Sequence, residues 1–180
     1  MIFENDELYL KFPTIEDKDL VMDFRREMLE SNSNFAGSGK LEDFENYLDW
    51  LEKVKNDTSV ENLPKDRVPA TLFLTIRKSD NKMVGIVQVR HHIEHKYLKV
   101  YGGHIGDSIR PSERNKGYAT AQIGLALEFC RVLGIKEVLL TADENNISSI
   151  KSILKNDGIF DKMVEDKETN KKLNRYFIYL

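Results

Sequence analysis

The sequence is short of several features that would point to particular classes of protein. Cys130 is the only cysteine among the 180 residues, so the chain cannot form an internal disulfide, and a lone thiol fits a reducing compartment. No apolar run approaches the roughly 20 residues that a membrane span needs. Residues 1–12 lack the basic and apolar regions of a signal peptide. We therefore expect a cytoplasmic protein that does not insert into a membrane.

Neither basic nor acidic residues are in large excess. The chain has 27 Lys and Arg residues against 30 Asp and Glu residues, a net charge of −3 at pH 7. A protein without a basic surplus has no general attraction to nucleic acid, so we expect no nucleic-acid partner. The 41% hydrophobic and 32% charged residues are typical of a globular protein. We expect residues 1–180 to form one domain with a buried core.

The residues before position 70 predict one strand and two helices. Residues Leu8–Phe12 alternate like a strand, and Thr14 and Asp17 resemble a capping box at the start of the first helix. The small polar residues and two glycines of Ser31–Lys40 predict a loop. A second helix is expected after this loop, with one buried face made of Leu41, Phe44, Leu48 and Leu51.

From position 71 the pattern changes to short apolar strands interrupted by two helices. The expected strands are Thr71–Arg77, Met83–Arg90, Val100–Ile109, Lys136–Thr141, Phe160–Glu165 and Leu173–Leu180. The helix Gly117–Leu133 is apolar nearly all round and should be deeply buried, whereas Asn146–Asn156 is a shorter helix. The predicted order of elements is β-α-α-β-β-β-α-β-α-β-β, which is an α+β fold.

The loop before the buried helix, Arg114–Thr120, has the composition of an anion site. The first N–H groups of a helix have no partners within it and carry a partial positive charge. Gly117 has no side chain to block a phosphate, Ala119 keeps the next position narrow, and Arg114 and Lys116 add positive charge. The same residues also suit an ordinary turn with a solvated basic surface. Neither a P-loop nor the three-glycine dinucleotide motif is present, so several phosphate ligands stay open.

Three features around this loop resemble the cofactor core of the GNAT N-acetyltransferase superfamily. Arg114, Gly117 and Ala119 match the family signature Arg/Gln-x-x-Gly-x-Gly/Ala. The other two are an apolar strand end with a proline two positions later, and Asn-x-x-Ala/Ser at a helix start, matched by Ile109, Pro111, Asn146 and Ser149. The segment before the helix is similar to a bacterial subgroup of predicted acetyltransferases without a settled substrate. The resemblance implies a single-domain GNAT fold with a mixed, mostly antiparallel sheet flanked by helices.

The resemblance also implies that acetyl-CoA is the co-substrate and that no metal is needed. In the family the pantetheine arm pairs with the strand matched by Val100–Ile109, and its last N–H lies near the thioester carbonyl, where it can stabilise the oxyanion. In the family the pyrophosphate binds to the loop and the first turn of the helix that follows it. An Asn before a helix is also a common cap, so Asn146 has two interpretations. The implied cofactor-binding residues are Ser108, Ile109, Arg114, Asn115, Lys116, Gly117, Tyr118, Ala119, Thr120 and Asn146.

Acetyl transfer needs a neutral amine, although a free alkyl amine has a pKa of about 10.4. A base therefore removes a proton from the amine, and the candidates are Glu94, His104 and Asp107. Strand alternation places the last two on opposite faces, so at most one faces the substrate. His104 also suits a structural hydrogen bond, and a buried Asp107 would need a partner. The family commonly has a tyrosine acid where this chain has Ile153, so the acid is unassigned.

The stretch after residue 89 is rich in histidine. His91, His92 and His95 lack the helical spacing of a zinc protease and have no cysteine nearby, so we expect no metal site. The segment is either a polar loop or part of the acceptor site, lined by Arg90 and His91. Arg90 would then favour an acceptor that carries a carboxylate. Cys130 lies within the apolar helix and is expected in the core.

Three functions stay open at this point. The first is an N-acetyltransferase that moves an acetyl group from acetyl-CoA to a primary amine of a small molecule or peptide. The second is a GNAT-like domain that binds CoA without catalysis, which the absent tyrosine favours. The third is a protein that holds another nucleotide on the same loop. The C-terminal strands are compatible with a homodimer.

Overall fold

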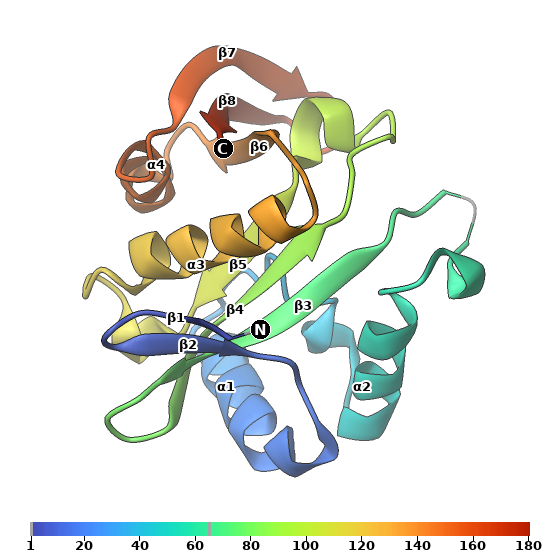
Figure 1. Ribbon diagram of the computed structural model, residues 1–180, viewed down its shortest axis with the longest axis vertical. Coiled ribbons are helices and arrows are strands. Elements are labelled where there is room, and N and C mark those ends of the chain that lie inside the picture. The colour runs from blue at the N-terminus through green and yellow to red at the C-terminus, as the bar shows by residue number, and fades with distance from the viewer. Residues whose placement is uncertain (1, 65) are drawn as a thin grey trace.

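Two antiparallel β-sheets and the helices that cover them make up the computed structural model, which describes residues 2–64 and 66–180 (Figure 1). The α-helices are α1 (Lys18–Glu30), α2 (Tyr47–Asn56), α3 (Tyr118–Val132) and α4 (Ile147–Leu154). The strands are β1 (Phe3–Glu4), β2 (Leu8–Lys11), β3 (Ala70–Arg77), β4 (Lys82–Arg90), β5 (Ile105–Ile109), β6 (Glu137–Asp143), β7 (Ile159–Asp166) and β8 (Lys171–Tyr179). Single turns of 3₁₀-helix lie at Ile15–Asp17, Leu41–Asp43, Val60–Asn62 and Pro111–Glu113, and a π-helical turn at Leu98–Gly102.

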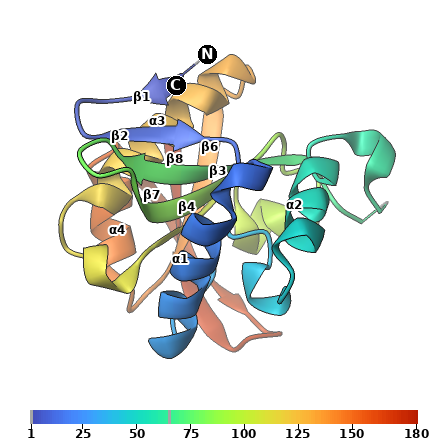
Figure 2. The same cartoon turned by 90° about the horizontal axis from the view of Figure 1, so that it is seen from below.

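The larger sheet has the order β1-β2-β3-β4-β5 and is covered on both faces. Leu72, Leu74 and Ile76 of β3 pack in one core with residues of α1 and α2, whereas Phe73 belongs to the core around α3. Figure 2 shows α1 and α2 on the same side of β3 and β4. Because helices cover both faces, the inner strand β3 is buried along nearly its whole length.

The smaller sheet has the order β6-β8-β7, so the last strand of the chain lies in the middle. It lies on the other side of α3 from β1 and β2 (Figure 1). Val138 and Leu140 of β6 and Tyr176 and Ile178 of β8 join the core that α3 shares with the larger sheet. Helix α3 therefore holds the two sheets together.

Glycines at both ends define α3. Gly117 precedes the helix with a φ of +88°, and Gly134 follows it with a φ of +73°. The left-handed region that these angles occupy favours glycine over other residues. Buried side chains lie around most of the helix: Tyr118, Gln122, Ile123, Leu125, Ala126, Leu127 and Cys130. The predicted helix and its deep burial are confirmed.

The predicted strand Val100–Ile109 is wrong in its first half. Residues Leu98–Gly102 form a π-helical turn, and β5 begins only at Ile105. Gly103 separates the two with a φ of +65°, which ends extended structure. Arg175 of β8 donates to the carbonyl oxygens of Lys99 and Val100, which occupies groups that a strand would have used for pairing.

The predicted buried face of the second helix is correct at Leu41 and Leu51, which are buried, and wrong at Leu48. Leu41 belongs to a separate 3₁₀ turn, and α2 begins after Asn46, whose side chain accepts from the N–H of Leu48. This start exposes half of Leu48, while the buried residues are Tyr47, Trp50, Leu51 and Val54. The apolar pattern therefore spans two short elements, the 3₁₀ turn and α2, and not one continuous helix.

The start of the chain agrees with the expectation except for one added strand. The predicted strand at Leu8–Phe12 is β2, and β1 forms a hairpin with it that the sequence did not predict. The N–H and hydroxyl of Thr14 each donate to the Asp17 carboxylate at 2.8 Å. The α+β class and the mostly antiparallel pairing are confirmed, although the strands divide into two sheets.

Candidate functional site

A cleft of about 820 Å³ runs from the N-terminus of α3 along the end of β5. Its walls come from three stretches that lie far apart in the sequence: the loop after α1, the chain from the end of β5 through the turn into the first turns of α3, and α4. The lining residues important below are Ser33, Ala36, Asp107, Ser108, Ile109, Glu113, Arg114, Asn115, Gly117, Tyr118, Ala119, Thr120, Asn146 and Ser149. Nine of the ten predicted cofactor-binding residues therefore line one cleft, and Lys116 does not.

The N-terminus of α3 opens onto the cleft and makes that end suited to an anion. Tyr118, Ala119 and Thr120 form the first turn, whose N–H groups have no partners within the helix, and all three line the cleft. No heavy atom lies within 4 Å of the position that a Cβ on Gly117 would occupy, so the approach to the turn is open. The cleft can therefore accept a phosphate directly on the helix axis.

Arg114 connects the loop to two other walls of the cleft. Its Nε donates to the carbonyl oxygen of Ile109 at 3.1 Å, and its Nη2 donates to the Ser33 hydroxyl at 2.9 Å. The guanidinium thus spans from the end of β5 to the loop after α1. This places a fixed positive charge beside the helix N-terminus.

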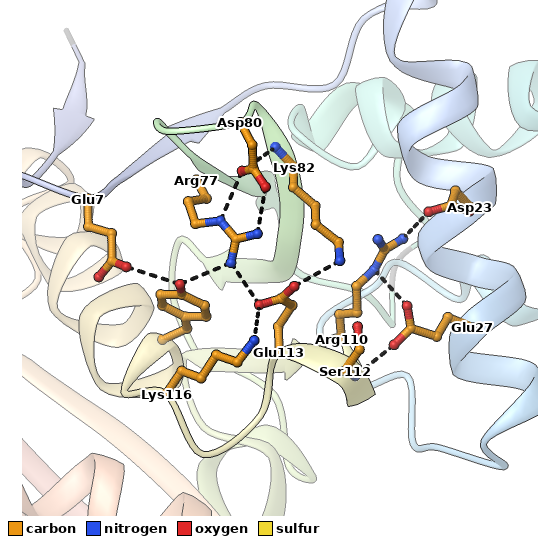
Figure 3. A network of polar contacts seen from close by, with 11 residues as sticks. Glu7, Asp23, Glu27, Arg77, Asp80, Lys82, Arg110, Ser112, Glu113 and Lys116 are labelled. Carbon is orange, nitrogen blue, oxygen red and sulfur yellow. Dashed lines mark hydrogen bonds and ion pairs between the residues drawn. The ribbon is translucent and has the colours of Figure 1, made fainter.

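Glu113 is the centre of a buried ionic network under the loop (Figure 3). Arg77, Lys82 and Lys116 each place a nitrogen 2.8 Å from its carboxylate. Burial alone would raise the pKa of Glu113, but hydrogen bonds from the three cations hold it at about 2. Lys116 is therefore engaged with Glu113, which explains why it does not line the cleft.

The other side of the turn is fastened to α1. Arg110 forms ion pairs with Asp23 at 2.6 Å and with Glu27 at 3.3 Å, and the Ser112 N–H donates to Glu27 at 2.7 Å (Figure 3). The hydrogen bond from Arg110 lowers the pKa of Asp23. Residues 110–116 are thus held between α1 and the β3–β4 hairpin. The sequence prediction missed Arg110 and Glu113, since most of their ion pairs join residues tens of positions apart and leave no local signal.

Strands β5 and β6 belong to different sheets, and His104, the residue before β5, bonds to β6. The N–H of His104 donates to the carbonyl oxygen of Leu139 at 2.7 Å, and the Leu139 N–H donates to Nδ1 of His104 at 2.9 Å. Burial lowers the pKa of His104 to about 4. The ring is therefore neutral and uses Nδ1 for structure, which agrees with the structural alternative for this residue.

The end of β5 offers a backbone donor to the cleft. Ser108 pairs with Ile86 and Ile109 with Gly85, and the Arg110 N–H donates to the carbonyl oxygen of Val84. Because backbone groups alternate along an antiparallel ladder, the N–H of Ile109 points away from β4. The Ser108 hydroxyl instead donates to the carbonyl oxygen of Ala36 at 2.7 Å and so binds the loop after α1.

The loop after α1 lies directly against β5. A Cβ added to Gly37 would be 1.9 Å from the carbonyl oxygen of Gly106, so only glycine fits at this contact. The indole N–H of Trp50 donates to the carbonyl oxygen of Ser38 at 2.9 Å and anchors the loop on α2. The loop therefore forms a fixed wall of the cleft.

Asp107 is the one predicted base that lines the cleft. It is half-buried, and its Oδ2 accepts from Nε2 of Gln122 at 3.2 Å. Burial raises the pKa of Asp107 to about 6, and the hydrogen bond from Gln122 opposes the rise. A carboxylate with a pKa near neutrality is suited to accept a proton.

The remaining predicted catalytic and acceptor residues lie outside the cleft lining. Glu94 is exposed and forms an ion pair with Lys99 at 3.2 Å. Arg90 donates to the carbonyl oxygen of Gly103 at 2.9 Å, and burial lowers its pKa. His91 lies 2.8 Å from the Thr71 hydroxyl, and burial lowers its pKa as well.

Helix α4 provides the wall opposite β5. The side chain of Asn146 accepts from the Ser149 N–H at 3.1 Å and lines the cleft, so it is a helix cap that also faces the ligand space. Ile153, at the position of the missing tyrosine, is buried in the core. Cys130 is buried too, and burial raises the pKa of its thiol to about 12. The thiol is thus unsuited to act as a nucleophile.

Two further searches cover residues 2–64 and 66–180. No group of three or more His, Cys, Asp or Glu side chains there is arranged to hold a metal ion. None of the helices in these residues combines the length and apolar character needed to cross a membrane.

The cleft is long, and the free N–H groups at the start of α3 lie at one end of it. The acetyltransferase (GNAT) domain family matches residues 7–158, so the chain belongs to the GNAT acetyltransferase family. No curated protein matches the chain in sequence.

Several solved structures share the fold. RimL, described as a ribosomal L7/L12 alpha-N-protein acetyltransferase in complex with coenzyme A, has a TM-score of 0.74 at 13% identity, over 100% of this chain and 98% of that one. An acetyl transferase from Salmonella typhimurium that modifies the N-terminal serine of L7/L12 has a TM-score of 0.69 at 13% identity, over 100% and 99%. MccE, a microcin C7 self immunity acetyltransferase in complex with acetyl-CoA and AMP, has a TM-score of 0.68 at 17% identity, over 98% and 94%. At these identities the likeness establishes the fold alone.

Proposed function

We propose that the chain is an N-acetyltransferase that moves an acetyl group from acetyl-CoA to a primary amine of a small molecule or a peptide. The observation that carries this proposal is the continuity of the cleft from the N-terminus of α3 to Ile109. One end suits the pyrophosphate, and the outward N–H of Ile109 suits the pantetheine arm or the thioester oxygen. Membership of the GNAT family supports acetyl-CoA as the acetyl donor, whereas the primary-amine acceptor is our proposal.

In this mechanism the carboxylate of Asp107, directly or through water, removes a proton from the ammonium form of the acceptor. The neutral nitrogen attacks the thioester carbon, a C–N bond forms, and the C–S bond breaks. The N–H of Ile109 stabilises the negative oxygen of the tetrahedral intermediate. The second amine proton passes to solvent, and the CoA thiolate takes a proton from solvent because Ile153 offers none.

The acceptor is proposed to enter beside the loop after α1. Peptide N-termini rank first among candidates, because RimL and the Salmonella typhimurium protein are described as acting on a ribosomal protein N-terminus. Arg90 lies outside the cleft lining and donates to the carbonyl oxygens of Gly102 and Gly103, so it is proposed as a contact for an acidic group on an acceptor that extends beyond the cleft. We also propose a cytoplasmic location, which suits the single reduced cysteine.

Thiol release from acetyl-CoA in the presence of amino acids, polyamines, aminoglycosides and short peptides tests the proposal. We expect one class of amine to stimulate release, and Asp107→Asn to lower kcat about 100-fold or more while CoA still binds. CoA binding without release for any amine would support the alternative, a non-catalytic CoA-binding domain, which the buried Ile153 favours. Binding of ATP in preference to CoA would refute both.

A further inference from the structure

A fully buried glutamine interrupts the apolar surface of α3. Gln122 is 0% exposed, and its neighbours on the helix include Ile123, Leu125 and Ala126. A buried amide is costly unless all of its polar atoms find partners. An apolar residue of the same size would fill this position at lower cost, so the amide needs an explanation beyond packing.

Both polar atoms of the Gln122 amide have hydrogen-bond partners. Its Nε2 donates to the carbonyl oxygen of Ile86 at 3.2 Å and to Oδ2 of Asp107 at 3.2 Å. Its Oε1 accepts from the hydroxyl of Thr75, which is also fully buried. Because a backbone carbonyl can only accept, Ile86 fixes which end of the amide faces Asp107. The amino group is thus held toward the carboxylate.

The strand beneath the helix is shaped for this glutamine. A Cβ added to Gly85 would be 2.3 Å from Oε1 of Gln122 and 2.8 Å from Cδ1 of Ile109. Glycine at this position therefore makes room for the amide. Residues from β3, β4 and β5 together surround one side chain of α3 whose free end reaches the cleft wall.

We propose that Gln122 is a positioning residue, which holds the Asp107 carboxylate in one orientation on the cleft wall and keeps it able to accept the proton of the acceptor amine. This inference rests on the proposed function. Oδ2 is the atom that Gln122 binds, so Oδ1 is the one presented to the amine or to a bridging water. The donated hydrogen bond favours the ionised carboxylate, which burial would otherwise disfavour.

The charged groups on the neighbouring elements are engaged elsewhere. On the same cleft, Arg114 is bonded to Ile109 and Ser33, and Glu113 is bonded to its three cations. Gln122 is the side chain that bonds to the Asp107 carboxylate in the described part of the chain. A change at Gln122 should therefore act on the ionisation of Asp107 without a competing charge.

A carbon-13 NMR titration of the aspartate carboxyls follows Asp107 directly, with Asp107→Asn used to assign its signal. We expect a midpoint near pH 6 in the wild type and about one pH unit higher in Gln122→Met, which keeps the length of the side chain but cannot donate. The acid limb of the kcat/KM profile should move by the same amount. Thr71→Val is the matched control, because it removes another buried hydroxyl of β3 that is bonded to His91 instead, and it should leave the midpoint unchanged.

An unchanged or lower midpoint in Gln122→Met would overturn the role of Gln122. If that variant does not fold, Gln122→Leu removes the same donor without adding a titrating group. The Asp107 midpoint must then rise by about one pH unit in Gln122→Leu, or the inference fails. Absence of acetyl transfer in the wild type with CoA bound would refute the proposed function instead, because the NMR midpoint does not depend on turnover.

Discussion

The two glycines that flank α3 allow a matched test of the anion site. Gly117 and Gly134 have φ angles of +88° and +73°, and an added Cβ meets no heavy atom within 4 Å at either position. Replacing each by alanine should therefore cost the same backbone strain, about 1 kcal/mol, without a clash. For a domain of this size that cost corresponds to a fall in Tm of roughly 2–4 °C.

The two variants should differ only in their affinity for CoA. Gly117 stands at the end of α3 that faces the cleft, so a methyl group there occupies space that the pyrophosphate needs. We expect Gly117→Ala to weaken CoA binding about tenfold or more, which is about 1.4 kcal/mol, and Gly134→Ala to leave it unchanged. Isothermal titration with CoA, and with pantetheine as a ligand that lacks phosphate, measures the difference. Pantetheine should bind both variants equally.

Equal CoA affinity of the two variants, with equal losses of Tm, would refute the phosphate site at the N-terminus of α3. A larger loss of Tm in Gly117→Ala than in Gly134→Ala would show a structural role for Gly117 that the open space around it does not suggest. Unfolding by denaturant in the absence of ligand separates this case from a binding effect.

Three further predictions follow from the buried polar groups. Glu113→Gln should lower the free energy of unfolding at pH 7; since its folded pKa of about 2 lies below the ordinary value, this difference should shrink as the pH falls from about 4.5 to 2, which urea unfolding at several pH values measures. Cys130 should not react with a thiol-specific disulfide reagent until the protein unfolds, because burial raises its pKa to about 12. His104→Phe should speed hydrogen exchange at the Leu139 amide, and unchanged exchange would show that this bond does not hold β5 to β6.

The sequence predicts the parts of the site that depend on local patterns. Gly117 and Ala119 lie at a spacing that marks a turn into a helix, and the structure has the helix and the cleft there. The need of Asp107 for a buried partner was also foreseen from physical chemistry. Its partner Gln122 has only one signal in the sequence, which is a single amide within an apolar helix.

Two of the missed features depend on contacts between residues far apart in the sequence, whereas the third has a local cause. Arg175 of β8 donates to two carbonyl oxygens of the π-helical turn before β5, and the network at Glu113 brings together Arg77, Lys82 and Lys116. Most of the bonded residues in the two arrangements are far apart along the chain, so no local sequence pattern predicts them. The exposed Leu48 was misplaced because a helix that begins a few residues later turns a different face to the core.

The central place of β8 in the smaller sheet has a consequence for how the protein is made. Strands β6 and β7 form no ladder with each other in the described residues, and each pairs with β8. A ribosome produces β8 after both of them. Until then the backbone N–H and C=O groups of β6 and β7 have no strand to pair with. The larger sheet needs no such delay, because its strands pair with the next strand along the chain. Synthesis therefore imposes an order on the two sheets: the sheet that carries β5 can form on the growing chain, whereas the smaller sheet can form only after β8 has been made.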